Sequence, residues 1–217
     1  MTEFTTWRSL VDGAVISDIP DADLYYPIDE GSGDTLNDSI GSRNATSVGS
    51  LVWVEDQEQS HGWLVELDDT NYVELTESFI DPDTDFSVGI EISVGEEGFD
   101  GDATFWNWGD GDERFAVGYR ADESEIGTED PSDDHPAHPE PDPPYTIDLF
   151  LTWDAENNDA ELFLNESSST TTNAPSTRFE DKQVIGARGD GGRDMQGQGV
   201  VRYAEFDEVV SPSEFTL

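Results

Sequence analysis

Two stretches of the chain alternate apolar and polar residues, which is the pattern of a strand that buries one face. In residues 145–153 the odd positions are apolar and the even positions are polar, with Phe150 as the exception. Turn formers follow at 154–159, and the chain returns through the apolar-rich residues 160–164, so the sequence predicts an antiparallel hairpin. Residues 86–94 alternate without a break. Such strands bury their apolar faces only against one another or against further strands, which favours a β-sandwich.

Shorter apolar stretches, separated by clusters of turn residues, predict roughly a dozen strands in all. Residues 104–108 and 115–119 are expected to pair as a second hairpin, and residues 35–50 are expected to form a loop. No segment carries a helical period. We therefore expect an all-β, two-sheet antiparallel β-sandwich. The other predicted strands are 24–28, 51–54, 63–67, 72–75, 183–186 and 200–209, with turns at 29–34 and 68–71.

The chain divides into a short first segment and one large domain. Residues 1–22 contain apolar residues that fit neither a helix nor a strand, and we interpret them as an arm for anchoring or oligomerisation. The alternative is an irregular first strand. Residues 23–217 are expected to form the sandwich domain. Within it, residues 121–144 are acidic and rich in proline, which lacks the N–H that a strand ladder needs, so we predict a long loop there.

The charge of the chain is extreme. Asp and Glu number 51 against 9 Lys and Arg, for a formal net charge of −42. Surface carboxylates tolerate this density in molar salt, where the Debye length is about 3 Å, so we interpret the protein as halophilic and unstable in low salt. An acidic surface repels phosphate, which argues against nucleic-acid binding. The chain has no cysteine, no secretory signal at its start and no stretch apolar enough to span a bilayer.

Three short motifs occur in a recognisable order. The first is Tyr-Pro-Ile-Asp-Glu-Gly-Ser-Gly at 26–33, followed by Asn-Asp-Ser at 37–39 and by Gly41. The second is Leu-Asp-Asp-Thr-Asn-Tyr-Val-Glu at 67–74, and the third is Phe-Asp-Glu-Val at 206–209. Together they resemble the laminin-G-like, concanavalin A-like jelly-roll family over residues 24–214, although Asp69 stands where that family usually has glycine. The resemblance implies two antiparallel sheets, one of them concave, with carbohydrate or protein binding and often a structural calcium.

Calcium takes six to eight oxygen ligands, which carboxylates and loop carbonyls supply. The resemblance favours Asp68, Asp69, Asn71 and Asp207 as ligands of a structural Ca²⁺. A second candidate cluster is formed by Asp110 and Asp112. In so acidic a chain, adjacent carboxylates also arise by chance, and this alternative stays open.

Aromatic residues supply the candidate ligand-binding site. Trp106, Trp108 and Tyr119 lie on neighbouring predicted strands, and Trp106 and Trp108 share one face. They fit a platform on which sugar rings stack, or else they belong to the hydrophobic core, which is the more common place for tryptophan at strand spacing.

Catalytic patterns are incomplete. Glu205-Phe206-Asp207-Glu208 resembles the start of the E-x-D-x-E strand of laminarinase-like glucanases, but valines occupy 209 and 210 and the third carboxylate is missing. His135 and His138 form an H-x-x-H pair in the proline-rich segment, where solvated side chains are a better interpretation than a transition-metal site. We therefore expect a protein without enzymatic activity.

These expectations combine into one functional hypothesis. A sandwich suited to adhesion, an unusual N-terminal arm and the absence of a signal fit a virion surface protein of a haloarchaeal virus, such as a spike, turret, fibre or capsid decoration. Such a protein would assemble in the host cytoplasm, form a symmetric homo-oligomer and bind other virion proteins through residues 1–22. It would recognise a host-surface glycan or glycoprotein without inserting into the membrane. The alternatives are a cellular haloarchaeal lectin-like protein and a diverged glycoside hydrolase.

Overall fold

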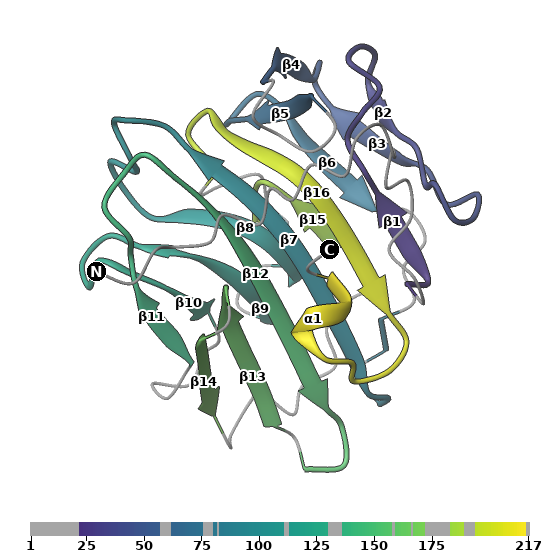
Figure 1. The fold of residues 1–217 in the computed structure, drawn as a ribbon, viewed down its shortest axis with the longest axis vertical. Helices are drawn as coiled ribbons and strands as arrows, with labels where there is room; N and C mark the ends of the chain where they lie inside the picture. The colour runs from purple at the N-terminus through teal and green to yellow at the C-terminus, as the bar shows by residue number, and fades with distance from the viewer. Residues whose placement is uncertain are drawn as a thin grey trace.

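The computed structural model describes residues 22–56, 62–75, 80–81, 83–110, 113–129, 136–157, 159–165, 167–171, 183–188 and 194–215. These residues form sixteen strands and one short helix, α1 (Pro212–Phe215). The strands build two eight-stranded sheets in which every pairing is antiparallel. The sheets lie face to face as a β-sandwich (Figure 1), which confirms the predicted fold class.

The front sheet, nearer the viewer in Figure 1, has β16 and β7 at its centre. Its strands lie in the order β14 (Ser167–Thr171), β13 (Asp159–Leu164), β12 (Tyr145–Asp154), β7 (Phe86–Val94), β16 (Gln198–Phe206), β5 (Trp63–Leu67) and β4 (Val52–Glu55). The eighth strand, β1 (Leu24–Tyr26), also pairs with β16.

The back sheet lies behind it. Its strands follow the order β11 (Ala137–Pro139), β10 (Glu125–Glu129), β9 (Glu113–Arg120), β8 (Ala103–Asp110), β15 (Gln183–Ile185), β6 (Tyr72–Leu75), β3 (Ala45–Val48) and β2 (Thr35–Leu36). The turn after β5 therefore carries the chain from the front sheet to the back sheet.

The two strongest strand predictions are confirmed and turn out to be neighbours. β7 and β12 pair along their whole length, with Ile147 opposite Ile92. β12 also forms the expected hairpin with β13. Because both strands belong to one sheet, their apolar faces are buried against the back sheet rather than against each other.

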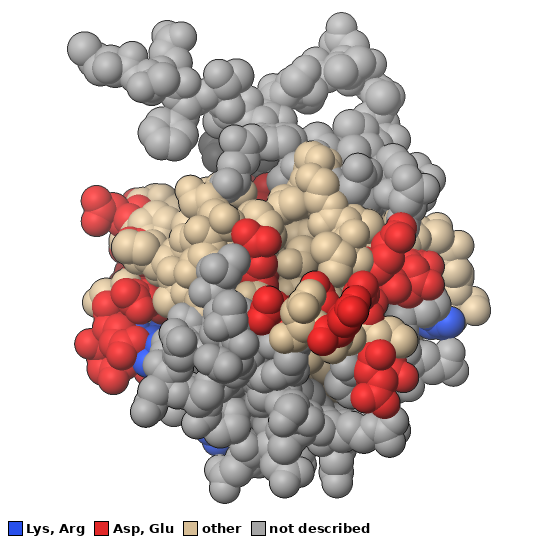
Figure 2. All heavy atoms as spheres, turned by 90° about the horizontal axis from the view of Figure 1, so that it is seen from below, with Lys and Arg blue, Asp and Glu red and all other residues tan. Residues whose placement is uncertain are grey.

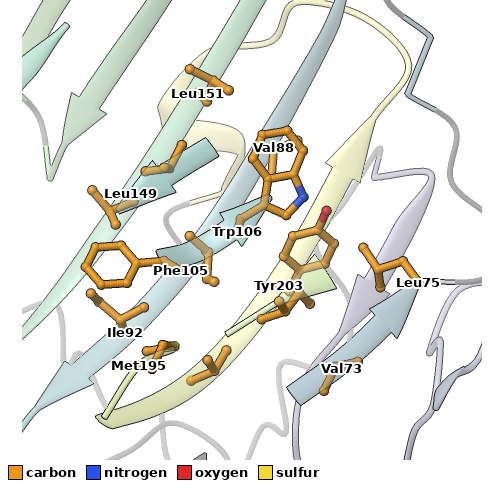
Figure 3. Packing of buried hydrophobic residues seen from close by; sticks show 14 of the residues in the cluster. Val73, Leu75, Val88, Ile92, Phe105, Trp106, Leu149, Leu151, Met195 and Tyr203 are labelled. Carbon is orange, nitrogen blue, oxygen red and sulfur yellow. The ribbon is translucent and has the colours of Figure 1, made fainter. Parts of the chain in front are cut away.

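The space between the sheets is filled by large apolar side chains, some of which Figure 3 shows. Leu149 and Val88 come from the front sheet, while Phe105 and Trp106 come from the back sheet. All four are at most 3% exposed. Each such side chain contributes about 1.5–3 kcal/mol on burial, which explains how so acidic a chain forms a compact fold.

Phe150, the exception in the alternating pattern, has a structural explanation. It points away from the back sheet and is 2% exposed, because α1 folds over this face of the front sheet. Phe215 of α1 contacts it with ring centroids 6.0 Å apart, and Phe206 lies beside it at 5.9 Å. The extra apolar residue therefore serves a second, smaller hydrophobic cluster.

The structure corrects two predicted loops and the predicted end of the last strand. The predicted loop at 35–50 contains β2 and β3, and the predicted loop at 121–144 contains β10 and β11. These strands are two to five residues long and contain few apolar residues, so they show no alternation. α1 was not predicted because four residues give no helical period. The last strand ends at Phe206 rather than at 209.

Two of the three motifs have clear structural roles. Asp38 accepts hydrogen bonds from the backbone N–H groups of Tyr25, Ile40 and Arg43, and so fixes the 38–43 turn against β1. Gly31 lies so close to the ring of Trp63 that a Cβ atom would come within 2.7 Å of it. The second motif forms the tight turn at 68–71, described below.

The predicted arm, residues 1–22, lies outside the described residues except for Ala22, which is buried. Among the described residues, no helix has the length and apolar character needed to cross a membrane.

Candidate functional site

The predicted aromatic platform belongs to the core. Trp106, Trp108 and Tyr119 are 0, 3 and 6% exposed, and they point between the sheets. Trp106 donates a hydrogen bond from Nε1 to Oε1 of Gln183, 3.3 Å away, within the buried interior. A stacking platform needs an open ring face, so the prediction that these three residues bind ligand is wrong as a set. Trp106 and Trp108 do share one face, as their spacing predicts, and that face is turned toward the other sheet.

The predicted calcium ligands are not brought together. Asp68 Oδ1 accepts hydrogen bonds from the N–H and hydroxyl of Thr70, both at 2.7 Å, and from the N–H of Asn71. Leu67 pairs with Gln198 at the start of β16, whereas Asp207 follows the end of that strand, nine residues further along the chain and about 30 Å away at strand spacing. Asp68, Asp69, Asn71 and Asp207 therefore do not form one calcium site.

Within the described part of the chain, no three His, Cys, Asp or Glu side chains gather where they could hold a metal ion. The second candidate pair cannot be placed: Asp112 and the side chain of Asp110 lie outside the described residues. Calcium binding elsewhere stays a prediction.

The remaining chemical candidates are buried too. Glu205, the first carboxylate of the glucanase-like pattern, is 0% exposed and accepts a hydrogen bond from the hydroxyl of Tyr203 at 2.7 Å. It points into the interior, where no polysaccharide can reach it. His138, expected to be solvated, lies in β11 with Nε2 3.0 Å from the carbonyl oxygen of Leu162, so it links the two sheets. His135 lies outside the described residues.

Both outer faces are closed at their centres. α1 covers the front sheet, and Phe215 is fully buried there. On the back sheet, Asn107 pairs with Ala116 on one side and with Val184 on the other, and all three are 0% exposed. The loop ends of the sandwich are therefore the better place to look for a binding site.

One loop end carries a cluster of partly exposed aromatic and acidic side chains. β7 ends here at Val94 and β12 begins here at Tyr145, which is its pairing partner. We define the end cluster as Phe99, Tyr119, Glu140 and Tyr145. Phe99, Glu140 and Tyr145 are partly exposed, and Tyr119 lies beneath them.

The cluster is built from contacts between four separate segments. Phe99, in the β7–β8 connection, stacks on Tyr119 of β9 with ring centroids 5.0 Å apart and planes 24° apart. Glu140, just after β11, accepts a hydrogen bond at 3.0 Å from the hydroxyl of Tyr145. The charge of Glu140 also acts on the phenol of Tyr119. The carboxylate therefore lies near the phenols of both β9 and β12.

Two glutamines hold the β7–β8 connection in place. Gln198 accepts the N–H of Gly95 at 2.7 Å and donates to the carbonyl of Gly98 at 3.1 Å. Gln196 accepts the N–H of Asp100 at 2.9 Å and donates to the carbonyl of Gly101 at 3.1 Å. The β7–β8 connection is therefore hydrogen-bonded to residues at or just before the start of β16, both before and after Phe99 in the sequence.

The electrostatic setting of the cluster is negative. Burial, followed by the charge of Glu140, raises the pKa of Tyr145 above its ordinary value. The pKa of Tyr119 is also raised, first by burial and then by Glu140, with a further contribution from Asp102. Both phenols therefore keep their protons well beyond neutral pH and act as hydrogen-bond donors.

The described surface on the side drawn in Figure 2 has a similar charge balance. Figure 2 shows acidic side chains in several places on the side that it presents, whereas basic ones are few there. This agrees with the composition of the whole chain.

The end cluster combines an aromatic face with fixed hydrogen-bonding groups. Aromatic rings stack on the apolar faces of sugars, and carboxylate and phenol oxygens accept hydrogen bonds from sugar hydroxyls. Sequence reasoning missed Phe99 and Glu140 because both lie in connections without periodicity. Tyr119 and Tyr145 stood in predicted strands, and their position at strand ends was the available signal.

The sequence matches no protein-family model and no curated protein. Solved structures with a similar fold include a trans-sialidase-active mutant of Trypanosoma rangeli sialidase, with a TM-score of 0.65 and 9% identity, covering 92% of this chain and 33% of that one. The chain thus spans about a third of the sialidase's length.

Two further structures extend the comparison. Domain 4 of AbnA, a GH43 extracellular arabinanase from Geobacillus stearothermophilus, has a TM-score of 0.64 and 13% identity, covering 90% of this chain and 97% of the domain. The binding domain of botulinum neurotoxin serotype C1 has a TM-score of 0.64 and 9% identity, covering 91% and 51%. At these identities the likeness concerns the fold, a β-sandwich.

Proposed function

We propose that this protein is a non-enzymatic recognition module that binds carbohydrate through the end cluster. The observation that carries the proposal is the stacked, partly exposed ring of Phe99 beside the carboxylate of Glu140, which bonds the hydroxyl of Tyr145. This arrangement offers a sugar an apolar face and oriented hydrogen-bond acceptors in one place. The interior position of Glu205 supports binding rather than hydrolysis, because the glucanase-like strand presents no carboxylate pair to a substrate.

The arabinanase domain supports the same proposal. This chain matches its length almost completely, and its structure is a complex with arabinotriose.

The test is glycan binding by the full chain in molar KCl. A glycan array followed by calorimetric titration of the best oligosaccharide should give saturable binding, and Phe99→Ala should weaken it by about tenfold or more, since a stacking interaction is removed. Val209→Ala is the matched control because Val209 is 47% exposed and lies at the opposite end of β16. Binding unaffected by Phe99→Ala, or release of reducing sugar from the bound oligosaccharide, would contradict the proposal.

We further propose that the module is displayed on the virion of a haloarchaeal virus. Two features of the sequence support this: 51 acidic residues suit a protein that works in brine, and residues 1–22 contain apolar residues suited to anchoring. In this role the protein assembles in the host cytoplasm, forms a homo-oligomer and presents the end cluster to a host-surface glycan or glycoprotein. Co-purification with virus particles tests it directly; recovery with host cell envelopes from uninfected cultures would contradict it.

The second candidate is a cellular haloarchaeal lectin-like protein. The near-complete match in length to a domain of an extracellular enzyme favours it. Both candidates share the binding site and differ in where the protein is found.

A further inference from the structure

We infer that the end cluster selects uncharged sugars over acidic ones. This rests on the carbohydrate binding proposed above and adds the chemical class of the ligand. Any sugar that stacks on Phe99 and reaches the phenol of Tyr145 comes within contact distance of Glu140, because Glu140 Oε1 lies 3.0 Å from that phenol oxygen. A carboxylate on the sugar would therefore lie next to the carboxylate of Glu140 and be repelled by it.

The acidic groups come from several elements. Asp102, at the end of the β7–β8 connection, accepts the N–H of Ala121 at 3.0 Å and acts electrostatically on Tyr119. Glu96, Glu97 and Asp100 are exposed on the same connection as Phe99. An acidic sugar would meet this field from the β7–β8 side as well as from Glu140.

The neighbouring cation is already engaged. Arg120 follows Tyr119 on β9, and its Nη2 lies 2.6 Å from Oε2 of Glu123. Adjacent residues of a strand point to opposite faces of the sheet, so the side chain of Arg120 is directed away from the face on which Tyr119 lies. Molar salt does not remove the repulsion at contact, because partly buried charges are screened much less than exposed ones.

A neutral sugar uses the same groups favourably. Its hydroxyls donate to the carboxylate of Glu140, and hydrogen bonds to a charged acceptor are stronger than those between neutral groups. The carboxylate therefore contributes to affinity and to discrimination through the same atoms, which makes Glu140 the residue to test.

The experiment compares one oligosaccharide in two forms. The neutral oligosaccharide that binds most tightly on the array is titrated into the full chain in 3 M KCl, alongside the same oligosaccharide with its primary alcohols oxidised to carboxylates. We expect the neutral form to bind at least tenfold more tightly. In Glu140→Gln, which keeps an acceptor oxygen for Tyr145, the neutral form should bind more weakly and the neutral-to-acidic ratio should fall about tenfold. Glu208→Gln removes the same charge from an exposed site at the opposite end of β16 and should leave the ratio unchanged.

The outcomes separate the two proposals. Equal affinity for the two forms, or an unchanged ratio in Glu140→Gln, overturns the selectivity while leaving carbohydrate binding in place. Absence of binding to every glycan overturns the proposed function, and the selectivity with it.

Discussion

The ring of Phe215 lies over the guanidinium of Arg202, with its centroid 4.5 Å from Cζ. Arg202 also forms ion pairs with Glu91, at 2.6 Å, and with Asp148, at 3.1 Å. The guanidinium is thus stabilised by one cation–π contact and by two ion pairs. Because Phe215 belongs to α1, this contact fastens the C-terminal segment to the outer face of the front sheet.

Removing the ring should loosen this attachment. Phe215→Ala deletes a side chain that is 0% exposed, so we expect the free energy of unfolding to fall by about 3 kcal/mol. Urea denaturation in 3 M KCl measures the change. The matched control is Val209→Ala in the preceding segment, where the side chain is 47% exposed and the change should be under about 0.5 kcal/mol. Equal stability of the two variants would mean that α1 does not contribute to the cooperative unit.

The position of the Phe215 ring should also require a glycine at residue 89. A Cβ atom at Gly89 would lie 2.3 Å from Cδ2 of Phe215, so Gly89→Ala forces the ring away and should destabilise the fold by about 1–3 kcal/mol. Combining it with Phe215→Ala should remove most of that penalty, which a double-mutant cycle detects as non-additivity. Gly95→Ala, with 3.6 Å to its nearest neighbour, is the control. Additive effects of the two substitutions would exclude the steric explanation.

The contact between Asp23 and Asp207 predicts that the stability of the fold depends on pH. Asp23 accepts the backbone N–H of Asp207 at 2.9 Å. Burial raises the pKa of Asp23 above 3.8, and the nearby charge of Asp207 adds to the rise. The folded state therefore holds this proton more tightly than the unfolded state, and the contribution to stability is lost as the pH rises from 3.8 through the raised value.

Asp23→Asn should thus stabilise the protein at pH 7, with a gain that shrinks to nothing as the pH falls below about 3.8, the ordinary value. Unfolding midpoints measured from pH 3 to pH 7 test this. Asp142→Asn removes one exposed negative charge and serves as the control for net charge. A constant gain across the pH range would rule out the titration of Asp23 as its cause.

The net charge of −42 predicts salt-dependent stability. Between 0.1 and 3 M KCl the repulsion among carboxylates is screened, so Tm should rise by at least about 10 °C, equivalent to about 3 kcal/mol. Thermal unfolding followed by circular dichroism measures the rise. Sucrose at equal osmolality does not screen charge and should raise Tm less. A Tm independent of KCl would contradict a halophilic protein.

If residues 1–22 anchor the protein, deleting them should prevent assembly without preventing folding. Deleting residues 1–21 leaves Ala22 and Asp23, whose contacts belong to the sandwich. If the segment is an anchor, the truncated chain should keep its circular dichroism spectrum and glycan affinity while its oligomeric mass, measured by light scattering, falls to that of a monomer. Loss of the folded spectrum would instead make the segment part of the core.

Several features of the fold follow from local sequence. Alternation over nine or more residues predicted β7 and β12, because a strand that buries one face must repeat every two residues. The turn residues between apolar stretches predicted the hairpins of β8 with β9 and of β12 with β13. Strands such as β2 and β11 gave no such signal, since they are short and contain few apolar residues.

Other features depend on which distant segments meet. Alternation shows that one side of a strand is buried, but Trp106 faces the interior and Phe150 the underside of α1 only because of how the sheets and the C-terminal segment pack. The same applies to the polar residues: Asp207 is separated from Asp68 by the length of β16, while Glu140 joins Tyr145 and Phe99 joins Tyr119 across breaks in the sequence.

The sequence alone therefore determined the class of fold, because side-chain periodicity is a local property of the backbone. The position of the end cluster was decided only by the tertiary structure, because Phe99 and Glu140 come from connections whose conformation is set by contacts with Gln196, Gln198 and Tyr145.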